Sequence, residues 1–496
     1  MIRPDHRLLN AAVAVVLLTV CFLSSVHAVS AAPLDHASVV ADVTLAREAY
    51  ERVHPGYTRY TDNAVLTAGW QAIIDKSAQR GGLSVEQLYL DVQAVLAKIR
   101  CDHTKAELPS SLAKPRRNGP FYLPLRFELV DGRALVHDAV PDNGVAAGDE
   151  LLAIDGQSIA SLINRWAPLI PVDAYTDHVR AGELAWSREF DGGAIEHFMA
   201  LEGVDPEATL TLKDAQGQTR TVTVARIGLT EQSQLAGSGA RNFADAVSLD
   251  LRDDQTAILR VDTFVNYRQP VDPDDLYAPL FKQIERAGVR HLIVDLRQNG
   301  GGSDDARNRL LAHLITEPTR MTEEIRVKTL DLDGLRPHLS SWEPKALNPS
   351  RWWFKQRDEG DYRIRGGLVS WLFGIRHVVK PARYAWSGRL TVLTSPANSS
   401  GSTMLLAALK GSGRARFVGG RSGGNVAGPT AGIQFTLTLP NSQIRTRLPV
   451  QRIVTGYSST SPTGSIEPDI LVQPSIEDRR AGRDVVLDAA LGIVAR

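Results

Sequence analysis

Cysteine is scarce in this chain of 496 residues, which has only Cys21 and Cys101. Net charge is also absent, because 56 acidic and 56 basic side chains balance, and aromatic residues make up 6% of the chain. With no basic stripe and no interleaved aromatics, the sequence argues against nucleic acid as a partner. No cysteine and histidine cluster has metal-ligand spacing either. We therefore expect a globular protein with no metal site and no organic cofactor.

The N-terminus carries the only long hydrophobic run, residues 8–26, preceded by Arg3 and Arg7 and followed by small residues. This order is typical of a secretory signal peptide. Residues 1–28 are the predicted signal, with cleavage after Ala28 or, alternatively, after Ala32. The mature protein would then be exported, periplasmic or extracellular, and would meet a membrane only before cleavage. An uncleaved signal anchor is the alternative.

Loss of the signal would leave Cys101 as the sole cysteine, so no intramolecular disulfide is expected. A free cysteine of this kind is usually a small buried apolar residue.

The pattern of the remaining chain predicts three parts. Residues 34–118 repeat apolar side chains at helical spacing and form an N-terminal helical domain. Residues 119–228 contain short β-rich runs broken by glycine and close with a hairpin. Within them, "GVAAGDELLAIDGQSI" resembles PDZ domains, and residues 166–190 read as an inserted helical segment. The second part is thus a PDZ-like β domain.

Residues 229–496 alternate strands and helices, which predicts an α/β core with a parallel-rich sheet and flanking helices. Ligands bind such sheets beyond the carboxyl ends of the strands. Two loops fall there, "RQNGGGSDD" at 297–305 and "SPANSSGS" at 395–402. The glycine loop lacks the lysine of a phosphate-binding loop, so it is either a plain turn or a cradle for an anion.

Ser399, Ser400 and Gly401 stand where a strand gives way to an apolar helix. A serine here can cap the helix, because its oxygen accepts a bond from a first-turn N–H group. It can equally be a nucleophile, because the same N–H groups would stabilise an oxyanion. The segment alone does not decide between a helix cap and a nucleophile.

Four motifs together resemble the C-terminal-processing, or tail-specific, serine peptidases. They are "CDHT" at 101–104, "LIVDLRQNGGG" at 292–302, "GRARFVGGRSGGN" at 413–425 and "IEPDILV" at 466–472. Their order matches the family's helical segment, PDZ domain and catalytic core. The resemblance implies that Ser400 is the nucleophile and that the N–H groups of Gly401, Gly300 and Gly301 form the oxyanion hole.

The general base follows from the same resemblance. The bacterial processing enzymes use a lysine where this chain has Asn425. Lys410 cannot replace it, since ten helical residues separate it from Ser400 by about 15 Å. The related tricorn protease core uses a histidine from the segment that matches "CDHT", which here is His103. The alternative for His103 is a capping or core histidine.

The third catalytic group is less defined in the sequence. The tricorn pattern has a glutamate where this chain has Thr463, and the neighbouring Glu467 is the candidate carboxylate. Asp102 and Asp295 are alternatives, although Asp295 is expected to anchor its own turn with Arg297.

Residues 318–386 match no motif and read as an insertion in the catalytic core. Its aromatic residues, set among many basic ones, predict either a packed core or an apolar rim or lid over the cleft, or a surface facing a membrane. They are Trp352, Trp353, Phe354, Trp371 and Phe373.

The sequence thus predicts an exported serine peptidase that cleaves polypeptides, with Ser400, His103 and Glu467 as its catalytic residues. Two alternatives stay open: a catalytically inactive peptide-binding homologue, and a serine hydrolase of small esters or amides.

Overall fold

The computed structural model describes residues 33–187, 189–235, 242–372, 375, 377–459 and 461–493. The predicted signal peptide, residues 1–28, lies outside the described residues. Among the helices that are described, none combines the length and the hydrophobicity needed to cross a bilayer.

Helices dominate the first part of the chain, as the apolar spacing predicted. Each of the three long helices starts at a side chain that accepts a bond from a first-turn N–H group, for example Ser84 from Gln87 at 3.1 Å. The elements are α1 (His36–Val53), α2 (Asn63–Arg80), α3 (Val85–Lys98) and α4 (Ser110–Asn118), with the two-residue strands β1 (Leu34–Asp35), β2 (Gly82–Leu83) and β3 (Ala106–Glu107).

The second part is an antiparallel sheet with the strand order β4-β5-β6-β8-β9. The predicted closing hairpin is present as β8 and β9, and the predicted inserted segment forms short 3-10 turns and α6. The bounds are β4 (Leu125–Val130), β5 (Arg133–Ala139), β6 (Glu150–Ile154), β7 (Gln157–Ser158), β8 (Glu207–Lys213), β9 (Thr219–Ala225), α5 (Ile159–Trp166), α6 (Arg180–Ala185), α7 (Ala194–Glu202) and α8 (Leu229–Gln232).

A six-stranded sheet of order β10-β11-β12-β19-β20-β23 forms the α/β core. From β11 to β23 the neighbouring strands are parallel, which confirms the predicted parallel-rich sheet, and β10 is antiparallel at the edge. The strands are β10 (Val247–Leu251), β11 (Thr256–Val261), β12 (His291–Asp295), β19 (Arg389–Thr394), β20 (Arg416–Gly419) and β23 (Ile470–Leu471).

Helices cover both faces of this sheet. Leu292, Val294 and Val392 pack on one face with apolar residues of α9, α10 and α12, and Ile293 and Leu393 pack on the other with α14. Burial of both faces explains why the centre of β12, "LIV" at 292–294, is an unbroken apolar run. The helices are α9 (Pro273–Arg286), α10 (Asp304–Leu314), α12 (Ser400–Gly411), α13 (Ile476–Arg480) and α14 (Val485–Gly492).

A further sheet has the order β15-β21-β22-β14-β17-β16, and β3 also pairs with β22. Much of it comes from the predicted insertion 318–386, which therefore folds into the core rather than standing apart. The strands of this sheet are β14 (Glu324–Val327), β15 (Leu339–Ser341), β16 (Phe354–Gln356), β17 (Tyr362–Ile364), β21 (Thr430–Thr438) and β22 (Arg445–Val454). The insertion also contains α11 (Leu368–Leu372) and the strands β13 (Thr319–Arg320) and β18 (Val378–Val379), which pair with each other in a separate sheet.

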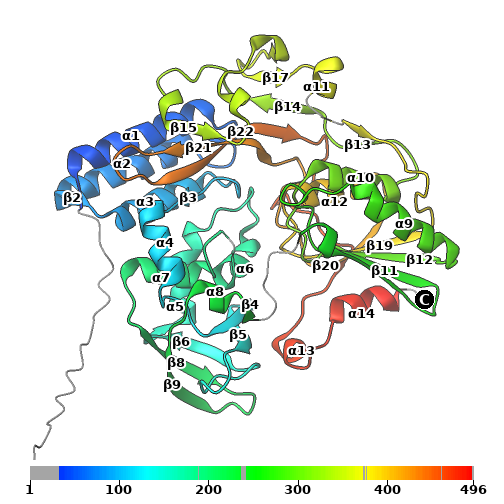
Figure 1. The fold of residues 1–496 in the computed structure, drawn as a ribbon, viewed down its shortest axis with the longest axis horizontal. Coiled ribbons are helices and arrows are strands. Elements are labelled where there is room, and N and C mark those ends of the chain that lie inside the picture. Colours follow the sequence, from blue (N-terminus) through cyan, green and yellow to red (C-terminus); the bar gives the residue numbers. More distant parts are fainter. Residues whose placement is uncertain are drawn as a thin grey trace, which may run out of the picture.

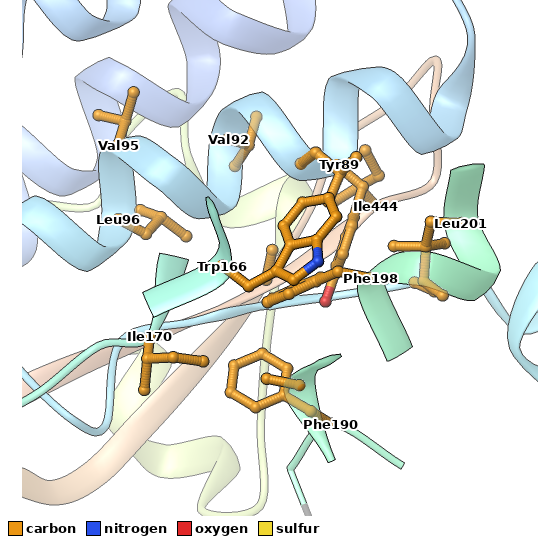
Figure 2. Close-up of a cluster of buried hydrophobic side chains, with 14 of the residues drawn as sticks. Tyr89, Val92, Val95, Leu96, Trp166, Ile170, Phe190, Phe198, Leu201 and Ile444 are labelled. Atoms are coloured by element: carbon orange, nitrogen blue, oxygen red, sulfur yellow. The ribbon is translucent and has the colours of Figure 1, made fainter. Parts of the chain in front are cut away.

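The hydrophobic cores cross the predicted boundaries at 118 and 228. One buried cluster joins α1 to α3, the β4–β9 sheet and the β21–β22 hairpin, which runs beside the N-terminal helices (Figure 1). Figure 2 shows its centre, where Trp166 and Phe198, with ring centroids 5.3 Å apart, lie beneath Tyr89 and Val92 of α3. Ile444, from just before β22, closes the same cluster.

Candidate active site

Two loops meet at the carboxyl ends of the adjacent parallel strands β12 and β19. The Asn398 side-chain amide, fully buried, donates to the carbonyl oxygens of Leu296 at 2.6 Å and Asn299 at 3.1 Å. It thereby ties the serine loop to the glycine loop. Sequence reasoning missed Asn398, because nothing in its own segment identifies its partners about 100 residues earlier.

Ser400 begins α12 with a φ of 48°, in the left-handed region that residues other than glycine seldom adopt. Ser399, the residue at the N-cap, makes no side-chain capping bond. Its hydroxyl instead donates to Asp102 Oδ2. The capping interpretation of the serine pair is therefore wrong, and Ser400 lies in a strained turn between strand and helix.

The glycine turn packs directly against this serine. A Cβ atom at Gly301, where φ is 103°, would lie 2.9 Å from the Gly401 nitrogen and 3.1 Å from Ser400 Cβ. Only glycine therefore permits this approach. The loop at 297–305 is thus more than a plain turn, because it is shaped to the serine.

The predicted oxyanion hole needs one correction. The N–H of Gly301 donates to Asn299 Oδ1 at 2.9 Å, and because an amide has a single proton it is not available to a substrate oxygen. Gly401 lies in the first turn of α12, where an N–H group has no acceptor within the helix. Across the described residues, no hydrogen bond uses the N–H of Gly401 or of Gly300. These two amides remain as donors.

His103 lies in the turn that follows α3, and its Nδ1 is in close contact with Asp102 Oδ1. Because Asp102 also accepts the Ser399 hydroxyl, one carboxylate joins the histidine turn to the serine loop. His103 and Ser400 line the same cavity. No direct hydrogen bond between them is recorded in the part of the chain that is described.

The pair of His103 and Asp102 is buried and mutually stabilised. Burial alone would lower the pKa of His103, but the negative charge and hydrogen bond of Asp102 outweigh it and raise that pKa well above its usual value. Burial would raise the pKa of Asp102, but the charge of His103 and the bonds from His103 and Ser399 hold it well below its usual range.

Asp173 supports this turn from a distant part of the chain. Its Oδ1 accepts the backbone N–H of Asp102 at 3.1 Å. Burial and the nearby charge of Asp102 raise the pKa of Asp173 to about 8. Neither the spacing of residues nor any motif indicated it.

These residues also provide the one group of possible metal ligands found among the described residues. One ligand atom from each of Cys101, Asp102, His103 and Asp173 lies within 4.8 Å of the others. Cys101 is buried, as predicted, and its thiol donates weakly to the Thr430 carbonyl at 3.4 Å. The sequence expectation that no metal-ligand spacing exists missed this group, because Asp173 joins the cysteine and histidine only in three dimensions.

The structure does not bring Glu467 to the site. Its carboxylate accepts bonds from Arg421 Nε at 2.7 Å and Ser461 Oγ at 2.6 Å, and it does not line the cavity. Its carboxylate is thus engaged by Arg421 and Ser461 rather than by His103. Thr463, at the position of the tricorn glutamate, bonds to Ser461 and Ser465.

Other sequence predictions have clear outcomes. Asp295 anchors its turn as expected, since it accepts the Arg297 backbone N–H at 3.1 Å and pairs with its guanidinium at 2.7 Å. Asn425 donates to the Tyr60 hydroxyl at 2.9 Å rather than to any catalytic group. Lys410 pairs with Asp469 at 2.6 Å, which removes it as a base.

The cavity that contains Ser400 has a volume of 2130 Å³. Its walls come from all parts of the chain: His103 after α3, Arg126 and His137 on β4 and β5, and the insertion. From the insertion, Trp353 and Phe354 are partly buried against Ile364 and Val369 and also line the cavity. Trp352 is exposed, and Phe373 and the side chain of Trp371 lie outside the described residues. The insertion is therefore both a small core and a rim of the cleft.

Residues 255–472 match the model of peptidase family S41. The chain carries a peptidase S41 domain. The match includes the glycine turn, Ser400 and "IEPDILV", but not the segment of His103. S41 peptidases are serine proteases, so the matched domain is that of a serine-type hydrolase.

Solved structures of CPAF share the fold over most of this chain. Mature CPAF is 18% identical with a TM-score of 0.63, covering 92% of this chain and 96% of CPAF. Mature CPAF complexed with lactacystin is 17% identical with a TM-score of 0.62, covering 93% and 98%. The photosystem II D1 C-terminal processing protease is 16% identical with a TM-score of 0.44, covering 90% and 98%. No curated protein matches the chain in sequence.

Proposed function

We propose that this S41 peptidase cleaves polypeptides with Ser400 as nucleophile, His103 as general base and Asp102, in place of Glu467, as the carboxylate that orients the histidine. The observation that carries the proposal is the position of Asp102, which contacts His103 Nδ1 and accepts the hydroxyl of Ser399, the neighbour of Ser400. With Nδ1 held by Asp102, Nε2 is the nitrogen left to act on a serine proton.

In the proposed reaction, Ser400 Oγ bonds to the carbonyl carbon of the scissile peptide while its proton passes to His103. The carbonyl oxygen becomes an oxyanion that the N–H groups of Gly401 and Gly300 stabilise. His103 then returns the proton to the leaving amine as the C–N bond breaks. Water repeats the sequence on the acyl-enzyme, which releases the acid and restores Ser400.

The size of the cavity favours a polypeptide over a small ester. Pockets for small molecules usually occupy about 300–1,000 Å³, whereas this cavity measures 2130 Å³. An extended chain would fill it, with residues 119–228 acting as a PDZ-like domain that guides the chain and residues 34–118 as a supporting helical domain.

Replacement of the two central side chains tests the assignment. His103→Ala and Ser400→Ala should each lower kcat/KM on a peptide by roughly 10³- to 10⁶-fold, and the double variant should be little worse, because members of one catalytic unit are not additive. Asn425→Ala, at the family's lysine position, is the control and should cost far less. Near-full activity of His103→Ala would mean that another group activates Ser400.

A phosphonate probe that reacts with activated serine hydroxyls separates the remaining alternatives. Labelling of the wild type but not of Ser400→Ala is expected. An inactive peptide-binding homologue would not be labelled. A hydrolase of small esters would be labelled and would turn over acyl esters, but not peptides.

We also propose that the protein is exported and works in the periplasm or outside the cell. Support comes from Arg3, Arg7 and the hydrophobic run up to residue 26. The mature chain should begin at Val29, or at Pro33 if cleavage follows Ala32. Intact-mass analysis of the native protein that finds residues 1–28 retained would contradict this.

A further inference from the structure

The turn at residues 101–103 presents three different donor types to one point. These are the thiol of Cys101, the carboxylate of Asp102 and the imidazole of His103, and Asp173 adds a second carboxylate from another chain segment. All four ligand atoms lie within 4.8 Å of one another. The donors thus come from two chain segments that meet beside the catalytic serine.

An independent observation at the same place concerns Asp173. Its side chain is almost fully buried, with 4% of the residue exposed, and only one of its oxygens is used, by the Asp102 N–H. The other oxygen, Oδ2, is buried and has no hydrogen-bond partner among the described residues. A buried carboxyl oxygen without a partner is costly, so a cation that displaces the proton of Asp173 and binds this oxygen would relieve it.

The mixture of donors selects the class of metal. Mg²⁺ and Ca²⁺ prefer oxygen ligands alone, whereas Zn²⁺ takes thiolate, imidazole and carboxylate in a four-coordinate site. Tetrahedral zinc with bonds of about 2.0–2.3 Å holds its ligand atoms roughly 3.3–3.8 Å apart. Because the four atoms lie within 4.8 Å of one another, the group would need to contract by about 1 Å at most.

We propose that Cys101, Asp102, His103 and Asp173 form a binding site for Zn²⁺ and that the bound ion inhibits the peptidase. The inhibitory part rests on the proposed function. A histidine that donates its lone pair to zinc cannot take the Ser400 proton, so metal binding and catalysis exclude each other. Asp102, His103 and Asp173 line the active-site cavity, which gives the ion a path of entry.

Metal binding can be measured without any activity. Co²⁺ added to the metal-free full chain should give the visible bands of a tetrahedral site together with a thiolate-to-cobalt charge-transfer absorption, and Zn²⁺ should displace it. The charge-transfer absorption should vanish in Cys101→Ala. If wild type and Cys101→Ala give the same spectrum, the site is wrong whatever the protein catalyses.

Inhibition is measured on the same proteins, each relative to its own metal-free rate on a peptide. Zn²⁺ should inhibit the wild type reversibly, with activity restored by a chelator, and the inhibition constant should rise at least tenfold in Cys101→Ala. His137→Ala is the matched control, because His137 lines the same cavity outside the group and its loss should leave zinc inhibition unchanged. Equal inhibition of wild type and Cys101→Ala, or loss of inhibition in His137→Ala, would overturn the proposal.

The two proposals fail in distinguishable ways. If Ser400 is not the nucleophile, the phosphonate probe fails while the cobalt spectrum still reports the metal site. If the metal site is wrong, the spectrum fails while the probe still labels Ser400.

Discussion

Asp102 makes two contacts at the candidate active site, one through each oxygen of its carboxylate. One oxygen contacts His103 Nδ1, and the other accepts the Ser399 hydroxyl. The carboxylate therefore fixes the imidazole and also holds the serine loop at the histidine turn. The charge of Asp102 has a measurable consequence, because it raises the pKa of His103 against the opposing effect of burial.

The first prediction concerns the pH dependence of activity. A base with a raised pKa is protonated at low pH and becomes competent only above that pKa, so kcat/KM should rise with pH through a value above that of an ordinary histidine. Asp102→Asn removes the charge and lowers the pKa of His103. The rising limb of the pH profile of kcat/KM should therefore move to lower pH. The rate at its plateau should fall by roughly 10²- to 10⁴-fold, because the imidazole loses its orientation.

The measurement is the pH profile of kcat/KM for both proteins, with circular dichroism to show that the variant folds. Ser399→Ala is the companion variant, since it removes a bond to Asp102 but keeps the carboxylate. Its limb should shift much less. A limb that stays in place in Asp102→Asn would show that Asp102 does not act on the base.

At the scale of elements, the insertion builds the rim of the cleft as well as part of a sheet. Trp342, just after β15, is 73% exposed and lines the cavity, whereas Trp352 is 60% exposed and does not. An exposed indole at the mouth of a peptide-binding cleft gains contact area when substrate binds. The insertion thus offers two exposed tryptophans, of which only Trp342 lines the cavity.

Trp342→Ala should therefore weaken peptide binding, with KM raised roughly three- to tenfold and kcat little changed, while Trp352→Ala should behave as wild type. Neither should alter the melting temperature, since both side chains are largely exposed. Kinetics on one peptide and on one small acyl ester provide the comparison, because the ester is too short to reach the rim. Equal effects of the two substitutions would show that the rim of the cavity does not contribute to substrate recognition.

At the scale of the whole molecule, the β4–β9 sheet contributes a cation to the active-site cavity. Arg126 on β4 is 5% exposed, lies over the Trp186 ring at 3.1 Å, and has no hydrogen-bond partner for Nε or Nη1 among the described residues. Burial lowers the pKa of Arg126 to about 10, which leaves it charged at neutral pH. A carboxylate of the substrate is the group that would satisfy it.

If this part of the chain acts as a PDZ-like reader of chain ends, a free C-terminus should favour cleavage. A peptide with a C-terminal carboxylate should have a kcat/KM roughly tenfold higher than its C-terminal amide, and Arg126→Gln should abolish that difference. Arg260→Gln is the control, because Arg260 lines the cavity but lies 3.6 Å from Asp295. Equal rates for the two peptides on the wild type would leave this part as a scaffold or as a reader of internal sequence.

Local patterns of sequence determined much of the fold. The apolar spacing of residues 34–118 and the alternation after 229 are periodicities of single elements, and the helices and the parallel sheet that they predict are present. The same holds for Ser400 and the glycine turn, since a loop after a strand of a parallel sheet necessarily lies at the edge where ligands bind. Asp295 could be assigned to its turn because its partner Arg297 is two residues away.

Contacts between distant segments were decided only by the tertiary structure. Asp102 and Ser399 are 297 residues apart in the sequence, and no periodicity records that their side chains meet. Asp173, the occupied N–H of Gly301 and the pairing of Glu467 with Arg421 depend in the same way on which loops pack together. The sequence by itself determined the elements and the position of the Ser400 loop, because these depend on neighbours along the chain. Only tertiary packing decided which carboxylate reaches the histidine, because a side chain pairs with whichever charge the fold brings within a few ångströms.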